Sequence, residues 1–105
     1  MNYAGGITLF NSDFNILMDN TIISNEGDAI GIIWSNNNII ANNIIFNNTY
    51  GLRTQDAHNN KIYHNNFVNN KYCQAISTQG SVNVWDDGYP SGGNYWSDYK
   101  GTDLY

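Results

Sequence analysis

A repeat of 22 to 23 residues constrains the fold of this 105-residue chain more than any other feature. Each copy carries asparagines around short apolar runs, as in segments 15–25, 38–48 and 60–70. A further step of 23 residues from Asn60 reaches Asn83, which opens a divergent fourth copy. A unit of this length buries its apolar face only against neighbouring copies, so the repeat predicts a stacked array.

The content of each copy favours strands. Apolar residues come in bursts of two to four positions, which are too short for helices. Ile, Val, Phe and Thr favour strands, and Asn and Gly tolerate the left-handed backbone of tight corners. Stacked copies would pair each strand with its equivalent about 4.8 Å along the axis. The predicted fold is therefore all-β, a parallel β-helix (solenoid) of about four coils.

Alignment of the copies assigns columns of equivalent residues. The predicted interior columns are Ile7, Ile32, Leu52 and Ile76; Leu17, Ile40, Ile62 and Trp85; and Ile22, Ile45 and Phe67. The first of these columns requires a small insertion or deletion, because the segment that carries it stands closer to the lead Asn in the second and fourth copies. The predicted corner ladders, in which side-chain amides bond to their equivalents, are Asn20, Asn43 and Asn65, and Asn25, Asn48 and Asn70.

A further apolar column consists of Ile23, Phe46 and Val68. Strand alternation places it outside the coil, since it follows an inward column directly. It is either a contact stripe for a partner or a corner at which the alternation breaks, and we favour the corner.

The composition changes at Trp85, which divides the chain into coils over 1–84 and an aromatic, Gly-rich segment over 85–105. The end of a solenoid exposes strand edges and core, and terminal repeats usually cap it. We therefore favour an aromatic cap. The alternative is a carbohydrate platform, because aromatic faces stack on sugar rings. Its candidate binding residues are Trp85, Tyr89, Tyr95, Trp96 and Tyr99.

The Asn repeat followed by the stretch from Trp85-Asp86 to Asn94-Tyr95-Trp96-Ser97-Asp98-Tyr99 resembles NosD-type right-handed parallel β-helix proteins, especially surface proteins of methanogenic archaea. The resemblance implies an exported protein, either periplasmic or at the cell surface. It also implies copper, because the family is named after a copper-associated protein that helps to mature nitrous oxide reductase. Relatives of the same fold bind carbohydrate or cleave polysaccharide. The sequence shows no signal peptide, which leads us to expect a fragment of a larger protein.

The residues themselves offer weak metal sites. Copper prefers His, Cys and Met ligands, and His58 and His64 are the best candidates, although a strand separates them. Calcium needs six to eight oxygen ligands, and Asp86 and Asp87 are the best candidates for it. No cofactor is therefore predicted from the residues, and copper or calcium is suggested by the resemblance alone.

The candidate catalytic residues also give weak support for an active site. Asp19, Asn42, His64 and Asp87 share one column, and Arg53, Asp56, His58 and Lys61 gather on the third coil. Neither set gives the two facing carboxylates of a glycoside hydrolase. We therefore expect a non-catalytic protein, either a structural scaffold or a carbohydrate-binding module. The first alternative is a NosD-like copper protein. The second alternative is a polysaccharide lyase or hydrolase.

Charge and hydropathy exclude other partners. Four Lys and Arg against nine Asp and Glu give a net charge of −5, which does not suit nucleic acid or anionic lipid. No apolar run reaches the roughly 18 residues of a transmembrane segment. The expected partners are neighbouring coils or domains of the parent protein and a glycan. One N-glycosylation pattern, Asn47-Asn48-Thr49, suits an exported protein.

Overall fold

The computed structural model describes residues 5–78, 80–85 and 93–96, which form eleven strands and contain no helix. The first coil holds β1 (Ile7–Phe10), β2 (Ile16–Met18) and β3 (Thr21–Ile23). The next two coils hold β4 (Asp28–Ile33), β5 (Ile39–Ala41), β6 (Ile44–Phe46), β7 (Tyr50–Gln55), β8 (Lys61–Tyr63) and β9 (Asn66–Val68). Two further strands, β10 (Cys73–Thr78) and β11 (Tyr95–Trp96), belong to a fourth, partial coil.

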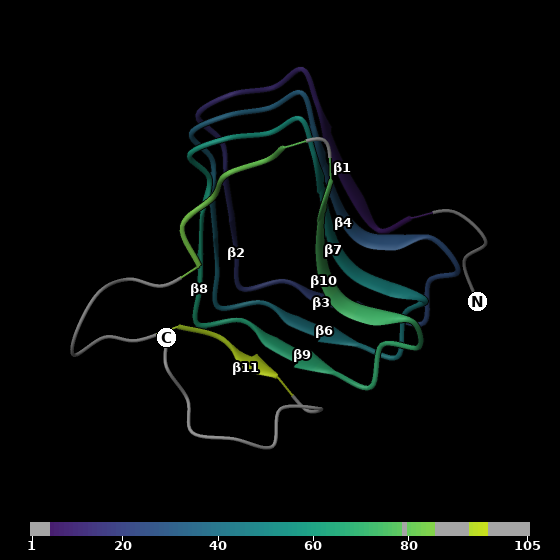
Figure 1. The fold of residues 1–105 in the computed structure, drawn as a ribbon. Helices are drawn as coiled ribbons and strands as arrows, with labels where there is room; N and C mark the ends of the chain where they lie inside the picture. The colour runs from purple at the N-terminus through teal and green to yellow at the C-terminus, as the bar shows by residue number, and fades with distance from the viewer. Residues whose placement is uncertain (1–4, 79, 86–92, 97–105) are drawn as a thin grey trace.

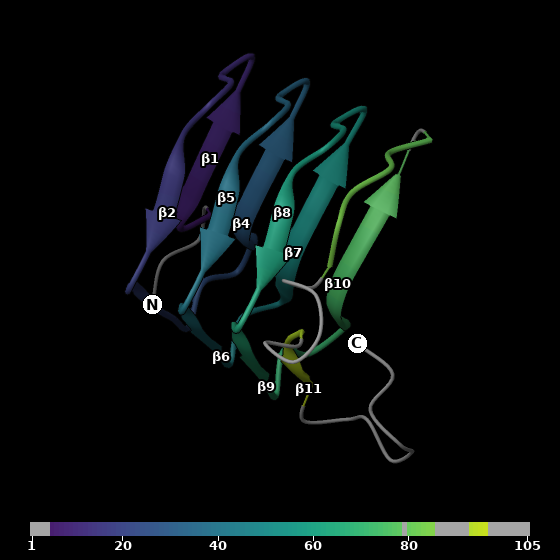
Figure 2. The ribbon, with the colours of Figure 1, turned by 90° about the vertical axis from the view of Figure 1, so that its left-hand side faces the viewer.

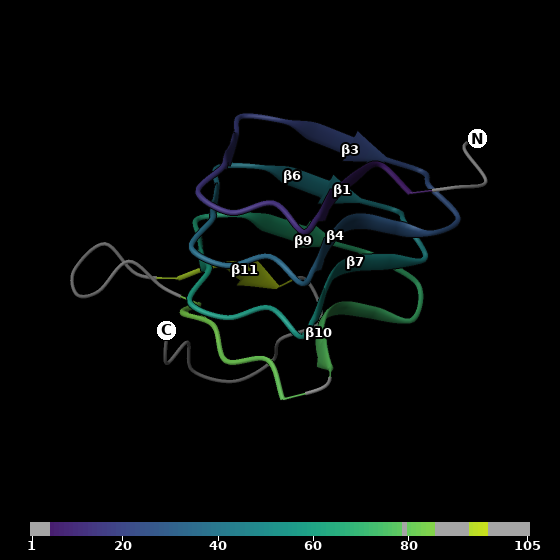
Figure 3. The ribbon, with the colours of Figure 1, turned by 90° about the horizontal axis from the view of Figure 1, so that it is seen from above.

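The strands form three parallel sheets, and each complete coil gives one strand to each sheet. The sheet orders are β1-β4-β7-β10, β2-β5-β8 and β3-β6-β9-β11. The coils nest on one another when seen along the stack (Figure 1), and equivalent strands run side by side in the same direction (Figure 2). Seen from above, β3, β6, β9 and β11 follow one another down the stack (Figure 3). The predicted β-solenoid is confirmed, with three full coils and part of a fourth.

The core is a row of side chains that point inward from each sheet. In the three-residue strands the middle residue faces inward, and Ile40, Ile45, Ile62 and Phe67 are fully buried there. Ala41, the last residue of β5, is buried as well. The registers Leu17–Ile40–Ile62 and Ile22–Ile45–Phe67 agree with two predicted columns. These columns remove apolar surface from water in every coil, which is the main stabilising contribution to such a stack.

The third predicted interior column is wrong in register. We call the sheet β1-β4-β7-β10, which contains the longest strands, the long sheet. In it, Ile7 pairs with Ile30, Ile30 with Leu52, and Leu52 with Ala75. The prediction placed Ile32 and Ile76 in that column instead. Ile32 is buried, but in the column of Leu9 and Thr54, whereas Ile76 faces outward and is 38% exposed. With the observed register each column member stands eight residues before the lead Asn of its coil, so the expected insertion or deletion does not exist.

Each complete coil turns at four corners of left-handed backbone. Twelve described residues other than Gly have positive φ, between 48° and 60°, and they form four columns of three: Asn11, Trp34 and Asp56; Phe14, Asn37 and Asn59; Asp19, Asn42 and His64; and Ser24, Asn47 and Asn69. Asn and Asp adopt this backbone readily because their short polar side chains bond locally. The high Asn content is thus explained partly by these corners.

The ladder asparagines directly follow three of these corners, and both predicted ladders are confirmed. Asn25 donates to Asn48 Oδ1 from its side-chain amide at 2.8 Å, and Asn48 donates to Asn70 Oδ1 at 3.1 Å. A third ladder, formed by Asn15, Asn38, Asn60 and Asn83, was not predicted as such. Asn94 extends the ladder of Asn65 by one rung, at 3.0 Å. Burying these amides carries little free-energy penalty because each has hydrogen-bond partners in the neighbouring coils.

The apolar column of Ile23, Phe46 and Val68 lies on the outer face of its sheet. Ile23 is 51% exposed and Phe46 is 39% exposed, while their strand neighbours Ile22 and Ile45 are buried. The preferred interpretation, a corner at which alternation breaks, is therefore wrong: alternation holds to the ends of β3 and β6. We call Ile23, Phe46 and Val68 the outer stripe.

Candidate functional site

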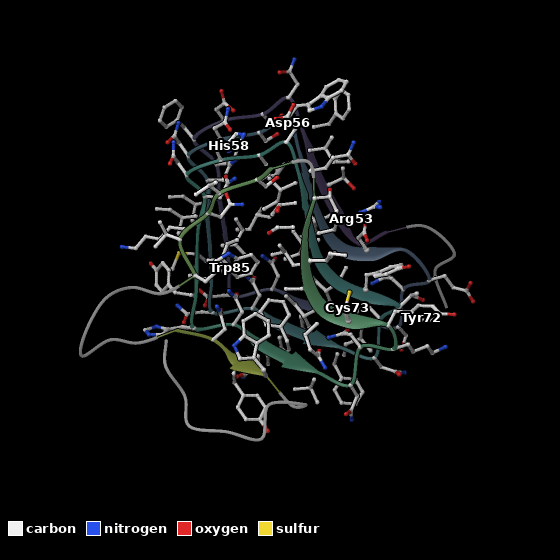
Figure 4. All side chains as sticks on the ribbon, viewed as in Figure 1. Arg53, Asp56, His58, Tyr72, Cys73 and Trp85 are labelled. Carbon is white, nitrogen blue, oxygen red and sulfur yellow. The ribbon has the colours of Figure 1, made fainter. Side chains whose placement is uncertain are left out.

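The two described tryptophans of the aromatic segment close the core. Trp96 pairs with Phe67 in register, and their rings stack at a centroid distance of 4.6 Å with planes 9° apart. Trp85 lies 6.1 Å from Trp96 and also packs against the core. Figure 4 shows Trp85 turned toward the inside of the coil. These rings offer little free face to a sugar.

The other residues of the predicted carbohydrate platform divide into two groups. Tyr95 is 58% exposed, because it precedes the inward Trp96 on β11. Tyr89 and Tyr99 lie outside the described residues, as do the predicted metal ligands Asp86 and Asp87. Among the described members of the platform, only Tyr95 presents a largely exposed ring.

His58 lies in a turn between β7 and β8 that carries its own ladder. Asp13 Oδ1 accepts from the Asn36 backbone N–H, Asn36 Oδ1 accepts from His58 N–H, and His58 Nδ1 accepts from Val82 N–H at 3.3 Å. This turn ladder was not predicted, because its members differ in residue type. Since Nδ1 is an acceptor, the proton of the neutral ring lies on Nε2. Nε2 faces Asp56 Oδ1 at 3.4 Å, as Figure 4 shows at the same corner.

His64 occupies a different corner, across β8 from His58. Its backbone is left-handed, with φ 55°, and its ring meets Tyr63 edge-on at 5.1 Å. Cys73 starts β10, and Figure 4 shows it on the opposite side of the coil from His58. Within residues 5–78, 80–85 and 93–96, no three His, Cys, Asp or Glu side chains come together to hold a metal ion.

The charged residues of the third coil do not converge. Arg53 points along the outer face of the long sheet and binds Asp28 of the coil before, with Nη2 at 2.8 Å and Nε at 3.0 Å from Oδ2. Lys61 lies over the Tyr63 ring at 5.3 Å. Asp56 instead faces His58. The column of Asp19, Asn42 and His64 is a corner column. The Arg53–Asp28 ion pair joins two coils, whereas the Lys61 and Asp56 contacts lie within one coil. The described members of the two sets do not form a carboxylate pair across a cleft.

The structure also places two aromatic rings on an outer corner, which sequence analysis missed. Phe10 and Trp34 of adjacent coils lie 5.1 Å apart and are 56% and 50% exposed. Trp34 has a left-handed backbone with φ 49°, in a column otherwise occupied by Asn11 and Asp56. Positive φ is unusual for a bulky residue and costs conformational energy. A Trp aligned with Asn and Asp in a corner column was the available signal.

Stacked parallel strands, inward columns and three asparagine ladders define a β-solenoid repeat protein. The match to known families agrees. Residues 1–101 match the family model described as periplasmic copper-binding protein (NosD), and the chain belongs to this family.

A curated relative is similar over most of the chain. It is a protein called cell surface glycoprotein, from Methanothermus fervidus, and it is 39% identical over 103 residues. The match covers 90% of this chain and 16% of the relative, so the chain spans about a sixth of that protein's length. No solved structure matches the chain. In addition, none of the described residues forms a helix that is long and apolar enough to cross a membrane.

Copper does not fit the described residues. His58 has Nδ1 engaged with the Val82 N–H and offers only Nε2, beside one carboxylate. His64 and Cys73 lie on other parts of the coil. A copper ion bound by soft or borderline ligands needs several of them around one point, and the described part of the chain does not supply this arrangement.

Proposed function

We propose that this chain is an exported, non-catalytic segment of a cell-surface protein and serves as a rigid β-solenoid scaffold. The observation that carries this proposal is the set of asparagine ladders. They run through all three complete coils, and the rungs that start at Asn38, Asn43 and Asn48 each join a backbone N–H and a side-chain amide to one oxygen of the next coil. The Asn15 rung uses the backbone N–H, and its side-chain amide bonds Asp13 O instead. Such rungs fix the corners of adjacent coils relative to one another.

The ladders suit a mechanical role because their bonds are protected from water. Asn43, Asn48, Asn60 and Asn65 are at most 1% exposed. A buried amide that loses its partners pays the full cost of desolvation, about 1–3 kcal/mol for each group. Sliding or separating two coils would break several rungs together, so the coils should move as one body.

Export is supported by the family and by the relative. The family is described as periplasmic, and the relative is named a cell surface glycoprotein. Because the chain spans only a small part of that relative, its partners are proposed to be neighbouring coils or domains of a longer protein.

Protease treatment of intact cells tests the location. An antibody against this chain should lose its signal when the cells are treated with protease, while a cytoplasmic marker persists. A signal that survives until the cells are lysed would overturn the proposal. The scaffold role is tested on the purified protein, whose unfolding temperature should be the same in chelator and in added Cu²⁺ or Ca²⁺.

A second role, carbohydrate binding, is favoured by the Phe10–Trp34 ring pair. Its exposed faces are the kind of surface that stacks on sugar rings, and Asp56 follows Trp34 in the same corner column and can hydrogen-bond hydroxyl groups. Glycan-array binding that is lost in Trp34→Ala and kept in Tyr95→Ala would support this role. Equal binding by both variants and the wild type would exclude the ring pair.

A further inference from the structure

One asparagine differs from the others in its sequence context. Of the 20 Asn in the chain, only Asn47 has Ser or Thr two positions later, in Asn47-Asn48-Thr49. This is the acceptor pattern for N-linked glycosylation. In so Asn-rich a chain the pattern carries little weight alone, and the structure must show whether the acceptor is accessible.

Accessibility depends on which face of the coil the acceptor occupies. Of the two asparagines in the pattern, one is buried and the other is exposed. Asn48 is a ladder residue with no exposed surface, and its Nδ2 donates to Ile22 O at 3.0 Å and to Asn70 Oδ1 at 3.1 Å. Asn47, one residue earlier, is exposed. A pattern shifted by one residue would have placed the acceptor inside the core.

The Asn47 side chain is also held loosely. Its Nδ2 lies 3.4 Å from Ser24 Oγ, beyond the usual range for a hydrogen bond from nitrogen to oxygen. By contrast, the ladder amides make bonds of 2.8 to 3.1 Å. Glycosylation must use the side-chain nitrogen Nδ2. In the ladder residues Nδ2 is held in short hydrogen bonds, whereas in Asn47 its contact with Ser24 Oγ is long.

The position of Asn47 leaves room for a large substituent. It stands at the left-handed corner that follows β6, with φ 59°, in the column of Ser24 and Asn69. This corner turns the chain on the outer surface of the stack. The preceding residue, Phe46, belongs to the outer stripe and is 39% exposed. Its ring offers the first sugar an apolar surface that is otherwise in contact with water.

We propose that Asn47 is an N-glycosylation site, an inference that rests on the proposed export of the chain. The donor is an oligosaccharide linked through phosphate to a membrane lipid. Asn47 Nδ2 attacks the anomeric carbon of the first sugar. The new N–C bond forms, the bond from that carbon to the phosphate oxygen breaks, and the lipid phosphate leaves with the bonding electrons. Nδ2 releases one proton to solvent. The hydroxyl of Thr49 is the feature that the transferase recognises.

Peptide mapping of the protein purified from the cells that make it tests this site. Chymotrypsin cuts after Phe46 and Tyr50. Residues 47–50 can therefore be recovered as a four-residue peptide, or within a longer peptide when one of the cuts is missed. We expect this peptide to carry the mass of an oligosaccharide. Asn42 is the internal control, because it is an exposed, left-handed corner residue with Ile44 two positions later. It should be unmodified.

The result separates this inference from the proposed function. A protein that is cleaved on intact cells but carries an unmodified Asn47 would overturn the inference and leave the surface scaffold standing. A protein that is protected inside the cell with Asn47 unmodified would overturn both. Sugar on Asn42 would also overturn the inference, since the hydroxyl would then not select the site.

Variants produced in the same cells test the role of the hydroxyl. Thr49→Ala should abolish the modification although Asn47 remains, and Thr49→Ser should retain it. Asn47→Gln should likewise remove the sugar. Unfolding temperatures of the unglycosylated proteins show that the fold persists. Retention of the sugar in Thr49→Ala would contradict the proposal.

Discussion

The side-chain amide of Asn43 donates to Oδ1 of Asn65, one coil further along, at 2.9 Å, and the backbone N–H of Asn43 donates to the same oxygen at 3.0 Å. Asn43 Oδ1 in turn accepts from both the backbone and the side chain of Asn20, each at 3.0 Å. One amide therefore joins three coils, and its donor and acceptor ends are not interchangeable.

Asn43→Asp should destabilise the stack by on the order of 3 kcal/mol, because it replaces a donor with a buried negative charge facing Leu17 O and Asn65 Oδ1. The loss should shrink at acidic pH, where the carboxyl takes up a proton. Asn42→Asp is the matched control, since its corner column already contains Asp19. Urea unfolding measures both. Equal stability of the two variants would contradict the ladder.

Ile45→Ala should cost about 2–5 kcal/mol, because Ile45 is completely buried and the truncation leaves a cavity between the columns. Ile44→Ala, on the same strand but 44% exposed, should cost less than about 1 kcal/mol. Thermal unfolding of the pair tests which face of β6 is inward. The reverse order of stability would invert the assignment.

Trp96→Ala should remove about 2–4 kcal/mol, since it deletes the ring that covers Phe67. Tyr95→Ala, which truncates an exposed ring, should change the free energy of unfolding little. Tryptophan fluorescence during denaturation measures the unfolding of each variant. If Trp96→Ala unfolded at the wild-type denaturant concentration, the capping role of β11 would be wrong.

Arg53→Gln should lower the stability by no more than ~1 kcal/mol, because the Arg53 side chain of the pair is 42% exposed. Dissolved salt screens an ion pair of this kind. The difference between variant and wild type should therefore narrow as NaCl is raised. A difference that does not depend on salt would show that Arg53 acts by packing.

Titration of the chelator-stripped protein with Cu(I) and Cu(II) should give no tight stoichiometric binding, because the described ligands do not converge. His58→Gln and His64→Gln should leave the titration unchanged. One-to-one binding at micromolar affinity or better, lost in either variant, would show a copper site that these residues complete.

The repeat predicted the inward and ladder positions correctly where the aligned copies carry the same kind of residue. The interior column of Ile22, Ile45 and Phe67 and the ladder of Asn20, Asn43 and Asn65 follow from spacing, since the first is apolar in every coil and the second is Asn in every coil. The long strands were harder. A slip of two residues keeps the same face inward, so alternation does not separate Ile30 from Ile32. A slip of one residue turns Ile76 outward and Ala75 inward.

The candidate site was less predictable than the fold. The turn ladder of Asp13, Asn36 and His58 has no shared residue type, and the Phe10–Trp34 pair joins residues of different columns. Both depend on how adjacent coils are offset, which a single copy of the repeat does not encode.

The spacing of Asn and apolar residues was enough to predict the coil period, two of the asparagine ladders and the inward columns of the short strands, because the aligned copies keep the same kind of side chain at those positions. The register of the long sheet, the tautomer of His58 and the exposure of Asn47 followed from the folded structure alone. Each of these depends on bonds between residues about one coil apart, and local preference is the same for the alternatives.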